Sequence, residues 1–147
     1  MSELASGLTF VDTNVLAYAH DASESVRQPL AVEVLEGLWR SRSGIVSTQV
    51  LSEFYVVATR KFSPPMVRRE ARSIVDTYAA WPVVLVDPTL IVAASALEER
   101  HHLSFWDALV IEAARRGGAT RLVSEDLQTG RRIAGLVIEN PFATTPS

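Results

Sequence analysis

Short runs of apolar residues alternate along the chain with longer segments in which apolar residues recur every three or four positions. A short apolar run bounded by polar residues predicts a buried strand, and the longer period predicts an amphipathic helix. The strands predicted in this way are residues 8–11, 45–46, 83–86, 121–124 and 136–139. Because strands and helices alternate, we expect a three-layer α/β/α sandwich with a central, mainly parallel sheet of four to five strands.

Helices are expected between these strands. Their predicted ranges are 15–20, 25–43, 49–61, 64–80, 88–101, 105–116 and a short last one at 127–133. Pro64 and Pro65 suit the first turn of a helix, and Gly117 followed by Gly118 ends another. The sequence shows no repeat, no low-complexity segment and no long linker, so residues 1–147 are expected to form a single domain.

The most apolar window, residues 78–97, is not expected to cross a membrane. It contains Asp87 between Pro82 and Pro88, and two prolines with a charge are unfavourable inside a bilayer. The window is better explained as the end of one helix, a buried strand and the start of another helix.

Composition narrows the class of protein further. The chain has 147 residues, 48% of them hydrophobic, and no cysteine. The lack of cysteine excludes disulfides and thiolate metal sites and is compatible with a reducing cytoplasm. The first residues lack the basic region and apolar run of a secretory signal, so a cytoplasmic location is expected. A net charge of −3 does not favour a simple nucleic-acid binder, but it leaves open an enzyme that meets phosphate through a metal ion.

Two aspartates come at the ends of predicted strands. Asp12 directly follows residues 8–11, and Asp126 comes just after residues 121–124. In an open parallel sheet, ligands bind just outside the carboxyl ends of the strands. Each aspartate also has an ordinary alternative role, because Asp, Thr and Asn often cap the helix that follows.

Asp107 and Glu53 lie on predicted helices. On a helical wheel, Asp107 falls on the apolar arc of helix 105–116, where an ionised carboxylate is costly unless something pairs with it. Its alternative role is to complete a capping box with Ser104. Glu53 lies on the rim of the buried face of its helix, where it can equally pair with an arginine such as Arg60.

Other conspicuous side chains are not expected to form a site. Glu125 is expected to be solvated. The three tryptophans are Trp39, Trp81 and Trp106. They are expected to be packing or interface residues rather than stacking platforms.

The four acids can converge at one end of the sheet if this fold is right. Four carboxylates without basic partners repel one another. A hard divalent cation such as Mg²⁺ or Mn²⁺, which prefers oxygen ligands, resolves this conflict. Such an ion can activate water and stabilise the charge that develops on a phosphate under attack. Zinc is not expected, since there is no cysteine and no paired histidine.

The residues around these acids form short motifs in a recognisable order. The motifs are FVDTNVL at 10–16, SEF at 52–54, LSFWDALV at 103–110, LVSEDLQ at 122–128 and IENPF at 138–142. Together they resemble the PIN-domain family, and specifically VapC-type toxins of type II toxin–antitoxin pairs, over nearly the whole chain. One departure is Ser124, where the family often has Thr, and this change keeps the hydroxyl.

The resemblance implies a Mg²⁺- or Mn²⁺-dependent endoribonuclease. The acidic pocket implied by motif position consists of Asp12, Glu53, Asp107 and Asp126. The implied metal ligands are Asp12, Asp107 and Asp126, whereas Glu53 orients or deprotonates the attacking water, or completes the metal's coordination shell through a water. The residues implied to hydrogen-bond the carboxylates or metal-bound waters are Thr13, Asn14 and Ser124. The family also implies an RNA substrate, a homodimer and a cognate VapB-type antitoxin that blocks the pocket.

Two alternative functions stay open at this point. A haloacid-dehalogenase-type phosphatase or a receiver-like domain also has an aspartate after its first strand and binds Mg²⁺. The phosphatase expects a second Asp where this chain has Asn14, and the receiver expects a lysine late in the sheet, whereas the only lysine is Lys61. A PIN module that binds RNA or protein without cutting is the other alternative, and the full set of four acids argues against it.

Overall fold

The computed structural model describes residues 7–127 and 129–143. A six-stranded sheet runs through this part of the chain, with its strands in the order β3-β2-β1-β4-β6-β5. The strands are β1 (Leu8–Val11), β2 (Gly44–Ser47), β3 (Val83–Val84), β4 (Ala119–Val123), β5 (Arg132–Ile133) and β6 (Leu136–Glu139). Neighbouring strands are parallel except β5 and β6, which pair antiparallel.

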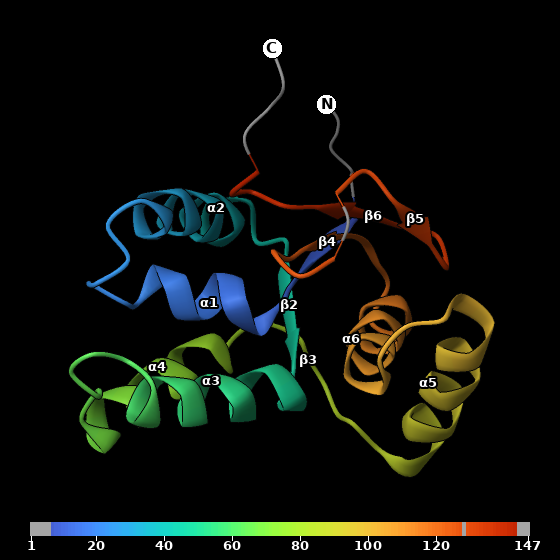
Figure 1. Cartoon of the computed structure of the whole chain (residues 1–147), viewed down its shortest axis with the longest axis horizontal. Helices are drawn as coiled ribbons and strands as arrows, with labels where there is room; N and C mark the ends of the chain where they lie inside the picture. Colours follow the sequence, from blue (N-terminus) through green and yellow to red (C-terminus); the bar gives the residue numbers. More distant parts are fainter. Residues whose placement is uncertain (1–6, 128, 144–147) are drawn as a thin grey trace.

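Six helices in the described residues cover this sheet (Figure 1). They are α1 (Thr13–Ala19), α2 (Arg27–Ser41), α3 (Thr48–Arg60), α4 (Arg68–Tyr78), α5 (Pro88–His101) and α6 (Phe105–Arg116). Helices α1 to α4 lie on one side of the strands in Figure 1, and α5 and α6 lie on the other. The expected sandwich around a mainly parallel sheet is confirmed, and the sheet has one strand more than the expected four to five.

Strand β1 lies at the centre of the sheet, between β2 and β4. Phe10 and Val11 of β1 are buried, and every residue of β2 is buried. Strands with helices on both faces bury side chains in both directions, which explains why these short strands are mostly apolar and why even Thr9 and Ser47 in them are buried. The fully buried core also includes Leu16 of α1, Phe54 of α3 and Ile111 of α6.

Polar residues between strands and helices cap the helix starts. Ser47 Oγ accepts the N–H of Val50 at 3.2 Å at the start of α3, and Asp87 Oδ1 accepts the N–H of Leu90 at 2.9 Å at the start of α5. Each cap satisfies a backbone donor that has no partner inside the helix. Because β1 and β2 continue almost directly into α1 and α3, residues at these junctions lie at one edge of the sheet.

The segment after β4 differs from its prediction. A short helix was expected at 127–133. Residue 128 lies outside the described residues, and the expected helix ends in β5, which forms a hairpin with β6, the strand predicted at 136–139. The turn consists of Ala134 and Gly135, which have φ angles of 52° and 85°. Positive φ at both central positions is the geometry that suits the twist of a two-residue hairpin. The helix prediction was wrong because Ala-Gly is a weaker turn pattern than Asn-Gly and because Asp126 was interpreted as a helix cap.

Two helices are shorter than expected. Helix α4 starts at Arg68, so Pro64 and Pro65 precede it. Helix α2 starts at Arg27 and is followed by Arg42 in the left-handed conformation, with φ 56°. Across 7–127 and 129–143, none of the helices combines the length and apolarity needed to span a bilayer.

Candidate metal centre

A small cavity of about 130 Å³ lies beyond the carboxyl ends of β1 and β4. The described residues that line it are Asp12, Thr13, Asn14, Gln49, Glu53, Trp106, Asp107, Val110 and Asp126. The structure therefore brings all four candidate acids to one place, from the end of β1, from α3, from α6 and from the turn after β4. None of these lining residues carries a positive charge.

The strand register explains why Asp12 meets Ser124. Val11 of β1 pairs with Val123 of β4, so the residues that follow them lie side by side. Ser124 Oγ donates to Asp12 Oδ2 at 2.7 Å, and the N–H of Thr13 donates to Asp12 Oδ1 at 2.8 Å. Asp12 thus caps α1 and also lines the cavity, so its role as a cap does not exclude a role in a site.

The acids of the cavity influence one another's protonation. The pKa of Asp12 is raised from 3.8 to about 6, mainly by burial and also by the charges of Asp126 and Glu53, and the hydrogen bonds from Ser124 and Thr13 offset part of this rise. Burial also raises the pKa of Asp107, and the charges of the same two acids add to this effect. Each ionised carboxylate therefore disfavours ionisation of its neighbours, a conflict that a cation relieves.

Glu53 is held by hydrogen bonds to both of its carboxylate oxygens. Thr13 Oγ1 donates to Glu53 Oε1 at 2.7 Å, and Gln49 Nε2 donates to Glu53 Oε2 at 3.1 Å. Packing of α1 against α3 brings Thr13 to this position. The carboxylate is oriented towards the cavity by these donors, rather than paired with Arg60 as the alternative had it.

Asp107 lies half-buried in the first turn of α6. Its N–H donates to Ser104 Oγ at 3.1 Å, so Ser104 caps the helix as expected. The carboxylate of Asp107 lines the cavity, close to the positive end of the helix dipole, which favours an anionic side chain.

Asp126 is placed by Asn14 and Ser124. Asn14 Nδ2 donates to Asp126 Oδ2 at 3.1 Å, and the N–H of Asp126 donates to Ser124 Oγ at 3.1 Å. The described residues that follow Asp126, 127 and 129–143, form no helix, so the alternative of a helix cap is wrong. Thr13, Asn14 and Ser124 each donate to a different acid of the cavity, and their part in binding a metal stays a prediction.

Glu125 is tied to two helices rather than solvated. Tyr18 OH donates to Glu125 Oε1 at 2.5 Å, and Arg27 Nε donates to Glu125 Oε2 at 2.6 Å. The N–H of Glu125 donates to Asn14 Oδ1 at 3.0 Å, and the Arg27 guanidinium lies 5.3 Å from the centre of the Tyr18 ring. We call Tyr18, Arg27 and Glu125 the turn clamp, because they fasten the turn that carries Asp126 to α1 and α2.

The protonation states of the turn clamp match these contacts. Burial and the hydrogen bond to Glu125 raise the pKa of Tyr18 to about 12. Burial alone would raise the pKa of Glu125, but the hydrogen bonds from Tyr18 and Arg27 bring it below its ordinary value. At neutral pH the phenol therefore donates and the carboxylate accepts.

The chemistry of the lining fits a hard divalent cation, which prefers oxygen ligands. Gln49 lines the cavity, and its Oε1 is buried without a hydrogen-bond partner in the described part of the chain. Water bound to an ion is a donor that would satisfy this oxygen. In the side-chain conformations described, no three Asp, Glu or His residues lie close enough to hold an ion together. Ion binding thus requires carboxylates to rotate towards each other, which their repulsion opposes until a cation is present.

Two residues of this region were missed from the sequence. Gln49 precedes Glu53 by four positions on α3, and this spacing was the available signal that the two side chains meet. Glu125 gave no local signal, because Tyr18 and Arg27 are 107 and 98 positions away.

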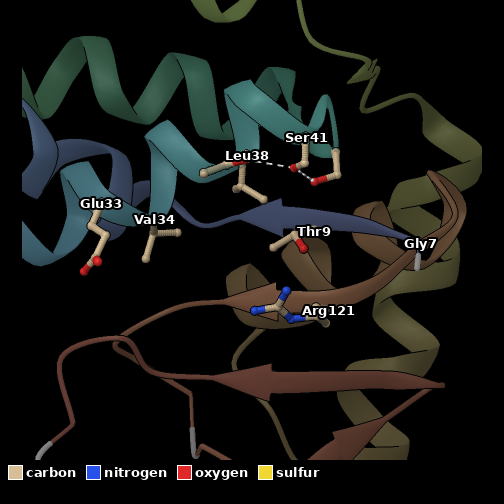
Figure 2. Close-up of a pocket in the computed structure, with 9 residues that line it drawn as sticks. Gly7, Thr9, Glu33, Val34, Leu38, Ser41 and Arg121 are labelled. Atoms are coloured by element: carbon tan, nitrogen blue, oxygen red, sulfur yellow. Dashed lines mark hydrogen bonds between the residues drawn. The ribbon is translucent and has the colours of Figure 1, made fainter. Parts of the chain in front are cut away.

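A larger cavity, of about 610 Å³, lies away from the acids. It is located between α2 and strands β1 and β4, near the start of β1, whereas Asp12 follows the end of that strand (Figure 2). Figure 2 shows Thr9 and Arg121 on neighbouring strands beneath Leu38 of α2. Arg121 is paired with Glu139 at 2.6 Å. Because its lining gathers no group of acids, we assign this cavity no part in the chemistry.

A family model described as PIN domain matches residues 9–135 of the chain. The matched range contains all four acids of the cavity. A search of curated proteins gave no match.

Several solved structures share the fold. VapC20 of Mycobacterium tuberculosis, described as a sarcin–ricin loop cleaving toxin, is 23% identical with a TM-score of 0.56, and the alignment covers 78% of this chain and 86% of that one. A toxin–antitoxin complex from Klebsiella pneumoniae is 17% identical with a TM-score of 0.69, and the alignment covers 90% of this chain and 97% of that one. VapBC2 from Rickettsia felis, bound to a DNA fragment from its promoter, is 21% identical with a TM-score of 0.60. That alignment covers 90% of this chain and 98% of the other. At these identities the likeness establishes a shared fold.

Proposed function

Because the chain belongs to the PIN-domain family, we propose that it is a metal-dependent endoribonuclease that hydrolyses phosphodiester bonds of RNA. The observation that carries this proposal is the convergence of four acids, from distant segments, on one small cavity whose described lining has no positive charge. Such a cluster is unfavourable alone but suits a divalent cation. Membership of the PIN family leaves the phosphatase and receiver alternatives without support.

The proposed roles follow the contacts of each side chain. Asp12, Asp107 and Asp126 would hold Mg²⁺ or Mn²⁺, which when bound supplies charge stabilisation at the phosphate and a more acidic water. Glu53 takes a proton from the attacking water, because Thr13 and Gln49 hold its carboxylate in one orientation.

Hydrogen-bond donors keep the other acids in place. Ser124 holds Asp12 through a bond of 2.7 Å, and Asn14 holds Asp126 through one of 3.1 Å. Donors of this kind restrict the conformations open to the carboxylates, which reduces the cost of assembling the site when a cation draws them together.

We further propose that the chain is the toxin of a type II toxin–antitoxin pair, acting in the cytoplasm as a homodimer and inhibited by a VapB-type antitoxin. The support comes from proteins of the same fold, since VapC20 is described as a toxin and two other structures are toxin–antitoxin or VapBC assemblies. A cavity rich in carboxylates is also complementary to an inserted arginine from a protein partner.

The direct test is cleavage of single-stranded RNA by the purified chain with Mg²⁺ or Mn²⁺, and with EDTA. We expect cleavage with either ion and none with EDTA. Asp12→Asn and Asp107→Asn should each lower the cleavage rate by at least about 100-fold, because each removes a charged ligand. Circular dichroism should show that both variants keep the fold.

Asp76→Asn is the matched control, because Asp76 is an exposed acid on α4 outside the cavity. It should cleave like the parent. Parental rates in Asp12→Asn or Asp107→Asn would contradict the assignment of the site. Calorimetry that detects no binding of Mg²⁺ or Mn²⁺ would instead favour a non-catalytic PIN module.

A further inference from the structure

Trp106 stands at the rim of the acidic cavity with 62% of its surface exposed. The packing role expected for the tryptophans holds for the other two. Trp81 is buried, and Trp39 lies against it with ring centroids 5.0 Å apart. Single exposed apolar residues are common on protein surfaces, so exposure alone means little. The position of Trp106 beside the acids is what calls for an explanation.

The local structure leaves the indole accessible next to Asp107. Trp106 precedes Asp107 in the first turn of α6, which Ser104 caps. Phe105 packs against the indole in an edge-on arrangement, with centroids 5.3 Å apart and an interplanar angle of 73°. Support from Phe105 limits the motion of the indole while its exposed surface stays open to solvent.

Electrostatics restricts how nucleic acid can be held here. Most nucleic-acid binding gains its affinity from Lys and Arg contacts to phosphates. The described lining of this cavity has four acids and no Lys or Arg, so it repels a phosphate wherever no cation intervenes. Affinity next to the cleaved bond must therefore come from the metal ion and from uncharged contacts. Stacking of a base on an aromatic ring is such a contact, and it tolerates any base.

We infer that the indole of Trp106 is a stacking platform for an unpaired nucleobase beside the phosphate that is cleaved. This inference rests on the proposed RNA cleavage. A base in an A-form duplex is already stacked on both faces, and only bases in single strands, loops or bulges can be splayed onto a side chain. The substrate class is therefore unpaired RNA.

The first test separates binding from chemistry in the cleavage of a single-stranded oligoribonucleotide. Trp106→Ala should raise KM roughly 5- to 100-fold, the range expected for loss of one stacked base, and leave kcat within about 3-fold. Trp106→Phe keeps an aromatic face and should raise KM less. Trp39→Phe is the matched control, because Trp39 packs on Trp81 away from the acids, and it should cleave like the parent.

The second test measures binding alone. Fluorescence anisotropy of a labelled oligoribonucleotide, in proteins that also carry Asp12→Asn, should show weaker binding for Trp106→Ala by the same factor. The RNA should also quench the tryptophan fluorescence of the Asp12→Asn protein. Adding Trp39→Phe to this protein should leave the quenching in place, whereas adding Trp106→Phe should remove most of it. A fully paired duplex of the same sequence should quench weakly.

Three results would overturn the inference. The first is that Trp106→Ala has a KM and a binding constant within 2-fold of the parent. The second is that duplex and single strand bind equally well. The third is that light scattering shows a changed oligomeric state in Trp106→Ala. The last result would make Trp106 a subunit contact. If the parent cleaves no RNA, the proposed function fails by that measurement, and the binding test still decides the role of Trp106.

Discussion

At the level of single residues, Asp12 combines two demands that conflict at neutral pH. Its carboxylate accepts the N–H of Thr13 and so starts α1, a task that a neutral Asn performs about as well. The residue is nevertheless only 6% exposed, which disfavours the ionised form of its side chain. The needs of folding do not explain an ionisable group at this position, whereas the proposed cation binding does.

Asp12→Asn is therefore expected to stabilise the metal-free protein above pH 6. The pKa of Asp12 is 3.8 in the unfolded chain and about 6 in the fold, so the folded state binds more protons between these values and stability falls as the pH rises through them. At 1.36 kcal/mol per pKa unit, the full penalty is about 3 kcal/mol. Urea unfolding in EDTA should show Asp12→Asn more stable by up to this amount at about pH 7.5, and equal to the parent near pH 4.

The exposed acid Asp76 again provides the comparison, and Asp76→Asn should show no such pH-dependent gain. A stability difference for Asp12→Asn that does not change with pH would show that the ionisation of Asp12 is not its source.

Thr13→Val tests whether Glu53 must be oriented. Valine has nearly the shape of threonine but cannot donate to Glu53 Oε1, a bond of 2.7 Å in the structure. Loss of a residue that positions a catalytic group typically costs about 10- to 100-fold, and we expect the single-turnover cleavage rate at saturating metal to fall by this factor. Thr13→Ser keeps the hydroxyl and should cleave within about 3-fold of the parent. Equal rates for Val and Ser would contradict the role given to Thr13.

The acids, and most of the side chains that donate hydrogen bonds to them, could be predicted from the sequence, but Gln49 could not. Asp12 follows an apolar strand and Asp107 lies on an apolar helical arc, so each was conspicuous by its surroundings. The orienting contact from Gln49 to Glu53 depends on side-chain rotamers within one turn of α3, which spacing suggests but does not determine. The exposure of Trp106 depends on how α6 meets the rest of the fold, which no local pattern encodes.

At the level of secondary-structure elements, the turn after β4 depends on contacts with α1 and α2. It contains no regular structure up to residue 127 and carries Asp126. The turn clamp supplies the order that a helix would otherwise provide, through two charge-assisted hydrogen bonds to Glu125. Movement of this turn would displace Asp126 from the cavity.

Tyr18→Phe is expected to weaken metal binding at a distance. The variant loses the bond to Glu125 but keeps the ring, whose edge-on contact with Phe142 has a centroid distance of 5.1 Å. A hydrogen bond to a charged group contributes about 1.5–3 kcal/mol, so a moderate loss of unfolding free energy is expected as well. Calorimetry should show several-fold weaker binding of Mn²⁺.

Tyr55→Phe serves as the control, since it makes the same chemical change at a partly buried tyrosine on α3 that lines a groove shared with α4. Its affinity for Mn²⁺ should match that of the parent. If Tyr18→Phe also matches the parent, the turn clamp stabilises the fold without placing Asp126.

Most elements could be predicted from hydrophobic period because the helices and central strands bury one or both faces. The exception after residue 126 has a physical cause. Strand β5 has only two residues, and its turn needs positive φ at Ala134 and Gly135, a requirement set by pairing with β6 rather than by local preference. Pairing partners of this kind are visible only in three dimensions.

At the level of the whole molecule, metal binding should stabilise the fold as a unit. The acids come from β1, α3, α6 and the turn after β4, and the unfolded chain has no such site. An ion at 100 times its dissociation constant stabilises by about 2.7 kcal/mol, which corresponds to a rise in Tm of about 5–10 °C for a chain of this size. Thermal unfolding with Mn²⁺ and with EDTA should show this rise in the parent.

The same rise should be absent or much smaller in Asp107→Asn. A Tm that responds equally to Mn²⁺ in the parent and in this variant would indicate that the ion binds elsewhere on the molecule.

The central position of β1 also determines when the protein becomes able to act during its own synthesis. Asp12 leaves the ribosome early, but the hydrogen bond that holds it comes from Ser124, 112 positions later, and β4 must emerge before β1 has both of its neighbours. Asp126 follows later still. A nascent chain, or one released early by interrupted translation, therefore has no complete acidic cavity. For the proposed toxin, nearly the whole time of synthesis therefore passes before an intact copy exists that the proposed antitoxin must inhibit.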